Sequence, residues 1–203
     1  RKQVFEGIYE TNHWNAQETR SGTGSVVSAT KSLRAFLHRV VEEFAITSIL
    51  DAGCGDMNWQ ALVPGIDKVR YHGVDIVAAM VEANREKFAA LGWRNMSFAV
   101  HDLVEGAVEG DYDLVMCRDT LIHLPHADVR KALHNIEATG AKFFLSHYDA
   151  GISVNTISVE PGGWHNINLL AHPFRLPAPL LTVNETEKGD GSMLALWRLP
   201  FVD

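Results

Sequence analysis

Short apolar stretches alternate with longer segments of helical periodicity along most of this chain. Five stretches with strand character lie at about 47–52, 70–75, 96–100, 112–117 and 141–147. The segments Ala78–Leu91 and Ala127–Thr139 carry apolar residues three and four positions apart, and a glycine follows each of them. This alternation predicts an α/β fold with a parallel sheet, helices on both faces, and a ligand at the carboxyl ends of the strands.

The N-terminal part reads as a polar loop followed by a helix. Apolar residues recur at helical spacing over about 26–45, and Ser25 is the expected N-cap. The loop Ser21–Ser25 is small, polar and rich in glycine. It is interpreted either as an anion cradle at the helix N-terminus or as a flexible linker with a cap. We expect residues 1–25 to close over the site, and we call them the lid segment.

The last quarter of the chain has a different pattern. Segment 150–179 holds four of the seven prolines and shows little periodicity, which predicts a structured excursion from the sheet. Two apolar stretches at 180–183 and 193–198 then flank Glu187–Gly191, a turn-rich link that is typical of an antiparallel hairpin. The whole chain, 1–203, is therefore expected to form one domain.

The first apolar stretch runs directly into an acid and two glycines. Asp51 is followed by Gly53 and Gly55, which allow a turn with positive φ and the close approach of a ligand. Asp75 ends the second stretch about twenty residues past Gly55, where a carboxylate can accept hydrogen bonds from both hydroxyls of a ribose. This pairing predicts a nucleotide pocket at the two strand ends.

Composition narrows the class of protein further. Of the 203 residues, 46% are hydrophobic and 21% are charged, which suits one domain with a sizeable core. A net charge of −7 provides no basic stripe for a nucleic acid, although it does not exclude a local basic patch. No apolar run approaches the roughly 18 residues that span a bilayer, and the first residues lack the apolar block of a signal peptide. We expect a cytoplasmic protein without a membrane segment, in which Cys54 and Cys117 are reduced thiols.

Four features follow one another in the same order as the strands: Asp51-x-Gly53-x-Gly55, Asp75, His101-Asp102-Leu103, and Tyr112–Asp119. In this order they resemble the class I S-adenosylmethionine-dependent methyltransferases over about 30–198. A further set is similar to a group of small bacterial methyltransferases whose acceptor is unassigned: Asn12, Trp14, Ser21–Ser25, Cys54–Trp59 and Cys117–Asp119. The resemblance implies a Rossmann-like, seven-stranded, mostly parallel sheet of order 3-2-1-4-5-7-6 with strand 7 antiparallel. S-adenosylmethionine would bind across the ends of strands 1, 2 and 4.

The resemblance also implies how residues at the strand ends hold the cofactor. Asp75 would accept two hydrogen bonds from the ribose diol. Asp102 would accept a hydrogen bond from the adenine amino group, while the Leu103 N–H donates to a ring nitrogen. Ile76 would pack on the face of the adenine ring.

Two further candidate cofactor-binding residues, Asp51 and Arg118, each have two possible roles. Asp51 either orients the glycine turn or contacts the cofactor directly. Arg118 pairs with the methionyl carboxylate or with a local acid such as Asp119. Trp14 and Arg20 of the lid segment are expected to close over the methionyl end, with Arg20 or loop N–H groups near its carboxylate.

Methyl transfer to a hydroxyl needs a group that accepts the hydroxyl proton. His123 follows the fourth strand and is the leading candidate, with a packed structural histidine as the alternative. Asp119 is the second candidate base, and His147 leaves the fifth strand on the same rim. The spacing His123-x-x-His126 is not a zinc signature, so no catalytic metal is expected.

The sequence thus predicts transfer of a methyl group to a hydroxyl or amine of a small polar molecule, such as a sugar. Aromatic and amide residues of the excursion, among them Trp164 and Asn166, suit such an acceptor. A nicotinamide-dependent oxidoreductase is one alternative, but Asn58 stands where its fingerprint needs a small residue. A protein that binds S-adenosylmethionine without turnover is the other alternative.

Overall fold

The computed structural model describes residues 1–189 and 191–201, and its centre is one seven-stranded sheet. The strand order is β3-β2-β1-β4-β5-β7-β6, which confirms the predicted fold class. The strands are β1 Ser48–Ala52, β2 Arg70–Asp75, β3 Met96–Val100, β4 Leu114–Met116, β5 Phe143–Asp149, β6 Leu181–Asn184 and β7 Ser192–Arg198. Strand β7 pairs antiparallel with both β5 and β6, and the other neighbours are parallel.

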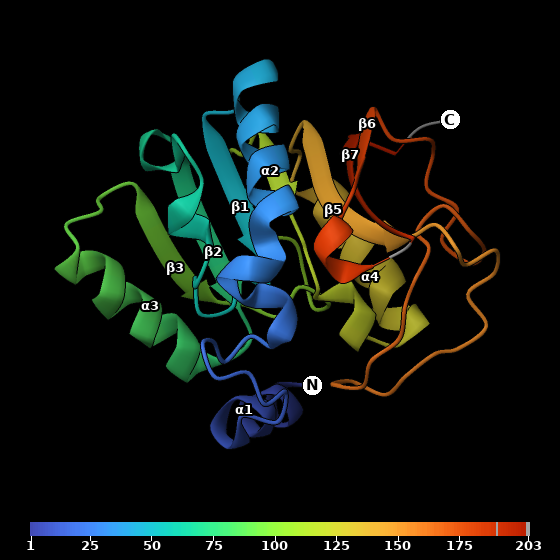
Figure 1. Cartoon of the computed structure of the whole chain (residues 1–203), viewed down its shortest axis with the longest axis horizontal. Helices are drawn as coiled ribbons and strands as arrows, with labels where there is room; N and C mark the ends of the chain where they lie inside the picture. Colours follow the sequence, from blue (N-terminus) through green and yellow to red (C-terminus); the bar gives the residue numbers. More distant parts are fainter. Residues whose placement is uncertain (190, 202–203) are drawn as a thin grey trace.

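Helices cover both faces of the sheet, as the βαβ pattern predicts. The α-helices are α1 Lys2–Thr11, α2 Lys31–Glu43, α3 Ala78–Ala90 and α4 His126–Ala138. Short 3-10 helices lie at Thr23–Ser25, Val27–Thr30, Gln60–Leu62, Ile66–Lys68, Leu121–His123 and Thr186–Lys188. In Figure 1, α2 crosses in front of the sheet while α4 lies behind it. None of the helices in the described ranges combines the length and the apolar character needed to cross a membrane.

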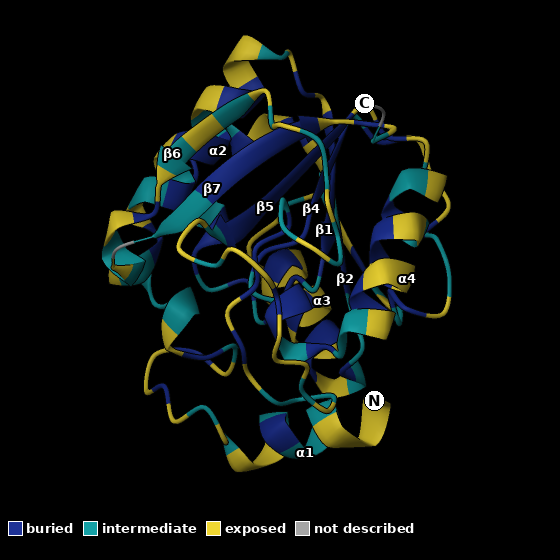
Figure 2. Ribbon diagram, turned by 90° about the vertical axis from the view of Figure 1, so that its right-hand side faces the viewer, coloured by how far each residue is buried: buried dark blue, intermediate teal, exposed yellow. Residues whose placement is uncertain are grey.

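Successive residues of the central strands lie alternately in two separate hydrophobic cores, one on each face of the sheet. Ile49 of β1 packs with the apolar faces of α2 and α3, whereas its neighbour Leu50 packs with the α4 side. This is the two-residue period of a strand that is buried on both faces. Figure 2 shows the central strands as buried, whereas α1 is largely exposed.

Helix α2 begins later than the periodicity predicts. The chain forms the 3-10 helix Val27–Thr30 first, and Ser25 makes no capping hydrogen bond. Glutamates from elsewhere bind the N–H groups at this end instead: Glu18 binds Val27 at 2.8 Å and Glu187 binds Ser32 at 3.0 Å. The predicted Ser25 cap was therefore wrong, because carboxylates from elsewhere in the protein bind the N–H groups at the helix start.

Two other segments differ from the regular pattern. Helix α1 was not predicted, and it lies beyond the carboxyl edge of the sheet, where Figure 1 places the N-terminus. Segment 150–179 is irregular apart from an isolated bridge between Val154 and His172. The remaining helices and strands agree with the predicted ranges to within about two residues, except that β4 is shorter than 112–117.

Candidate active site

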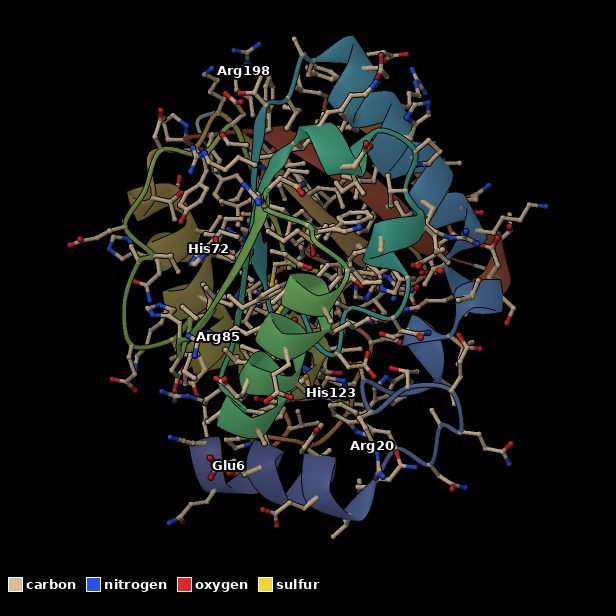
Figure 3. The ribbon with its side chains drawn as sticks, turned by 90° about the vertical axis from the view of Figure 1, so that its left-hand side faces the viewer. Glu6, Arg20, His72, Arg85, His123 and Arg198 are labelled. Carbon is tan, nitrogen blue, oxygen red and sulfur yellow. The ribbon has the colours of Figure 1, made fainter. Side chains whose placement is uncertain are left out.

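A cavity opens at the carboxyl ends of β1, β2 and β4, beneath α1. The structure brings all of the predicted cofactor-binding residues together in its wall: Trp14, Arg20, Asp51, Gly53, Gly55, Asp75, Ile76, Asp102, Leu103 and Arg118. We call this space the cofactor cavity. His123 and Arg20 point into the region between α1 and the sheet in Figure 3, whereas Arg198 lies at the opposite end of the molecule.

Neighbouring protein side chains require the glycines in the turn after β1. Gly53 has φ 90° and Gly55 has φ 59°, in the left-handed region that favours glycine. A Cβ on Gly53 would lie 2.1 Å from Thr120 Oγ1, and one on Gly55 would lie 2.2 Å from Ser21 Oγ. The turn is therefore packed against both the loop after β4 and the lid segment.

Asp75 is oriented by the backbone at the end of β2. The Gly55 N–H donates to its Oδ2 and the Val77 N–H donates to its Oδ1, both at 3.0 Å. Each carboxylate oxygen has two lone pairs, so one on each remains for a ligand hydroxyl. Burial raises the pKa of Asp75 above its usual range.

Asp51 is buried beneath the glycine turn, with 2% of its surface exposed. Its Oδ2 accepts hydrogen bonds from the Tyr71 hydroxyl and from Gln60 Nε2. Gln60 Nε2 also donates to the Cys54 carbonyl at 2.9 Å, which connects Asp51 to the turn. Burial raises the pKa of Asp51 to about 6. These contacts favour the orienting role, and the sequence reading missed Gln60 and Tyr71 as its partners.

The predicted adenine end of the cavity contains an ion pair. Asp102 Oδ2 lies 3.0 Å from Arg1 Nε, and the Val104 N–H donates to Asp102 Oδ1. Arg1 also pairs with Asp128 at 2.8 Å. Within the described part of the chain, the Leu103 N–H makes no hydrogen bond and so stays available to a ring nitrogen.

Arg118 and Arg20 differ in what they already bind. Arg118 is buried and pairs with Glu185 and Asp119, and its Nη1 also donates to the Gly24 carbonyl at 2.8 Å. The structure thus shows the local pairing that was the alternative to a methionyl carboxylate. Arg20 is exposed at the cavity and forms no ion pair among residues 1–189 and 191–201.

Asp56 ties the lid segment to the glycine turn, and the sequence reading missed it. Its carboxylate accepts hydrogen bonds from Thr19 Oγ1 at 2.8 Å, the Arg20 N–H at 2.7 Å and Ser21 Oγ at 3.1 Å. The Asp56 N–H donates back to Ser21 Oγ at 2.9 Å. Its position directly after Gly55 was the one available signal.

A second cavity adjoins the first. It is lined by residues of the lid segment, the ends of β4 and β5, the excursion and the β6–β7 link, including Asp119, His147, Asp149, Trp164, Asn166, Glu187 and Lys188. Trp14, Ser21, Asp119 and His123 line both cavities. The rings of Trp14 and His123 are stacked, with centroids 4.7 Å apart, so this pair forms part of the wall between them.

The three candidate bases have different electrostatic environments. His123 Nδ1 lies 2.7 Å from the Gly163 carbonyl, which can only accept, so Nδ1 carries the proton and Nε2 keeps its lone pair. Burial lowers the pKa of His123 below its usual range, so the ring is neutral at pH 7. His123 is therefore able to accept a proton through Nε2.

Asp119 and His147 are less suited to accept a proton. Burial acts to raise the pKa of Asp119, but Arg118 and Lys188 hold it well below its usual range. His147 Nδ1 lies 3.4 Å from Asp119 Oδ1, and burial together with Lys188 lowers the pKa of His147 to about 4. No cluster of three or more His, Cys, Asp or Glu side chains suited to a metal ion occurs among the described residues.

Comparisons with known proteins agree with this geometry. Residues 49–139 match the family model described as a methyltransferase domain. Aklanonic acid methyltransferase of Streptomyces sp. (strain C5) is 37% identical over 84 residues, which are 39% of this chain and 37% of that protein. The match thus spans little more than a third of the relative's length.

Two solved structures show the same fold over nearly the whole chain. N-methyltransferase NodS of Bradyrhizobium japonicum, in complex with S-adenosyl-L-homocysteine, has a TM-score of 0.66 at 14% identity and covers 95% of this chain and 98% of its own. Magnesium protoporphyrin IX methyltransferase of Synechocystis PCC 6803 has a TM-score of 0.63 at 15% identity, covering 95% and 93%. Residues 49–139, which run from β1 through α4, thus form a methyltransferase domain, and its strands belong to the seven-stranded sheet described above.

Proposed function

We propose that this chain transfers a methyl group from S-adenosylmethionine to a hydroxyl of a small polar acceptor, with His123 as the general base. The observation that carries the proposal is the position of His123 in the walls of both cavities, with Nδ1 held by the Gly163 carbonyl. The acceptor would occupy the second cavity, which we call the acceptor cavity. Segment 150–179 would roof it, and the lid segment would cover the cofactor.

The residues of the cofactor cavity fit S-adenosylmethionine. Asp75 retains lone pairs for the ribose diol, and the Leu103 N–H is available to adenine. Asp102 would accept from the adenine amino group while remaining paired with Arg1, since each of its oxygens has more than one lone pair. Arg20, which forms no ion pair with the described residues, provides a guanidinium for the methionyl carboxylate, a role that Arg118 is less free to take.

When bound, the cofactor supplies an electrophilic methyl group on a sulfonium. The chain's part is to hold the acceptor hydroxyl in line with that methyl and to exclude water. His123 Nε2 takes the hydroxyl proton as the oxygen attacks, while Gly163 fixes the ring. Asp119, held ionised by Arg118 and Lys188, would serve as a fixed negative charge near the base.

The test compares His123→Gln with Asp119→Asn in two measurements, methyl transfer and calorimetric binding of S-adenosylhomocysteine. We expect His123→Gln to lower turnover by about 10²–10⁴-fold while binding stays near wild type. Full turnover in His123→Gln together with its loss in Asp119→Asn would assign the base to the carboxylate. If neither variant loses turnover, the acceptor atom is a neutral amine, which needs no base.

A further inference from the structure

The acceptor cavity contains a carboxylate that has no cationic partner among the described residues. Asp149 is the last residue of β5, and its side chain lines this cavity together with His123 and Trp164. Its Oδ1 accepts a hydrogen bond from the Gly151 N–H at 2.8 Å. Within the part of the chain that the structure describes, Asp149 forms no ion pair with a basic side chain. One negative charge of the cavity is thus left for a ligand.

The other charged residues of this cavity already contact protein groups. Asp119 pairs with Arg118 and Lys188. Glu187 Oε1 accepts the N–H of Ser32 at the start of α2, while Glu187 Oε2 is buried without a hydrogen-bond partner among the described residues, which adds to the negative charge of the cavity. Lys188 is the one lining residue with a positive charge among the described residues, and Asp119 uses it. Among the described residues, the cavity therefore has no free cation for an acidic acceptor, and its remaining negative charge favours a positively charged acceptor.

The carboxylate of Asp149 is held in place by the backbone around it. The Asp149 N–H donates to the Ile167 carbonyl, and the Ala150 N–H donates to the Gly191 carbonyl, both at 2.8 Å. A Cβ on Gly191, where φ is 93°, would lie 2.9 Å from Asp149 Oδ1. The space beside this oxygen thus depends on glycine, and the direction of the side chain is fixed before a ligand arrives.

Covering such a carboxylate with a ligand removes water from it. If the ligand offers no positive charge, the desolvation cost is not recovered, whereas an ammonium group recovers it through a charge-assisted pair. The neighbouring residues suit the rest of such a molecule. Trp164 is 63% exposed and offers an aromatic face to a ring or a cation. Asn166 is exposed in the same cavity with an amide that makes no side-chain hydrogen bond within the described ranges.

Resting on the function proposed above, we infer that the acceptor is a polyhydroxylated amine of the aminosugar class. Its ammonium pairs with Asp149, and one of its hydroxyls faces His123. An ammonium has no lone pair, so the anchored nitrogen is not the atom that is methylated. The hydroxyl oxygen forms the new bond to the methyl carbon, the carbon–sulfur bond breaks with its electron pair going to sulfur, and the proton goes to His123 Nε2.

The experiment uses three hexose series that differ in charge. Labelled S-adenosylmethionine is supplied with glucose and galactose, with glucosamine and galactosamine, and with glucuronate and galacturonate, and kcat/KM is measured for each. We expect the amines to be best and the uronates worst. Asp149→Asn should lower kcat/KM for the amines by about 10–100-fold, the scale of a hydrogen bond to a charged group, and leave the neutral sugars within about twofold. Asp67→Asn, an exposed site away from both cavities, is the matched control.

Three results would overturn the inference. They are a preference for the uronates, an equal loss for amines and neutral sugars in Asp149→Asn, and transfer to none of the six sugars by an enzyme that binds S-adenosylhomocysteine in calorimetry. The last result leaves the proposed methyltransferase function intact. Absence of S-adenosylhomocysteine binding to the wild type would instead overturn the proposed function itself.

Discussion

Asp75 is held by two backbone N–H groups in a way that leaves lone pairs for a diol. We expect Asp75→Ala to weaken S-adenosylhomocysteine binding by about 1.5–3 kcal/mol, or roughly 10–100-fold, since hydrogen bonds to a charged acceptor are lost. Calorimetry measures this, with Glu86→Ala on the exposed side of α3 as the control. A variant that binds as tightly as wild type would remove Asp75 from the cofactor site.

The ionisation of His123 should be visible in the pH dependence of catalysis. A base must be unprotonated, and burial lowers the pKa of His123 below the usual value of about 6.5. Activity should therefore be full at neutral pH and decline only as pH falls through this lowered pKa. The measurement is kcat/KM against pH in wild type and His123→Gln. An acidic limb centred above pH 6.5, or one that persists in the variant, would contradict His123 as the base.

Variants of the two arginines of the cofactor cavity, Arg118 and Arg20, should have different effects, one on folding stability and the other on cofactor binding. Arg118→Met leaves Glu185, which is 0% exposed, with only Lys188 at 4.0 Å as a cationic partner, and breaking a buried pair in this way costs about 3–5 kcal/mol of folding stability. Arg20→Met removes an exposed charge, so it should leave urea unfolding unchanged and weaken S-adenosylhomocysteine binding. The opposite assignment, with Arg118→Met stable but poor in binding, would favour Arg118 at the methionyl carboxylate.

Among the larger elements, the lid segment depends on a single carboxylate. Asp56→Ala removes the acceptor that Thr19, Arg20 and Ser21 share, so the segment should leave the glycine turn more often. We expect faster trypsin cleavage after Arg20 and about tenfold weaker S-adenosylhomocysteine binding, since the segment loses three hydrogen bonds to a charged acceptor. Far-UV circular dichroism should not change, because the sheet is intact. Unchanged cleavage and binding would mean that packing of Trp14 alone holds the segment.

The sequence predicts elements well where periodicity and a local stop signal coincide. Helices α3 and α4 lie within one residue of their predicted ends, since glycines follow both. Helix α1 was not predicted, because its apolar side covers a cavity rather than the sheet and because Gly7 interrupts its hydrophobic periodicity. The start of α2 was misplaced because Glu187, 155 residues away from Ser32, satisfies its first turn. No local pattern carries that information.

On the scale of the whole molecule, the site also contains residues that local patterns predict and residues whose contacts come from distant parts of the chain. The residues that we predicted to bind the cofactor line one cavity, and the sequence could bring them together because the ends of parallel strands meet at one edge of the sheet. The partners that set the charge of the acceptor cavity could not be predicted from the sequence. Glu185 reaches Arg118 across 67 positions and Lys188 reaches Asp119 across 69, through the β6–β7 link. Sequence alone shows that such charges exist but not which partners they neutralise.

The stacked pair of Trp14 and His123 belongs to the walls of both cavities, and this has a thermodynamic consequence. A ligand that fixes the pair from one side changes the free energy of filling the other side. Linkage requires this coupling to be reciprocal, so the factor by which S-adenosylhomocysteine alters acceptor affinity must equal the factor by which acceptor alters S-adenosylhomocysteine affinity. Binding of S-adenosylhomocysteine in the presence of acceptor and binding of acceptor in the presence of S-adenosylhomocysteine would therefore measure one coupling free energy, to which this pair of rings is expected to contribute.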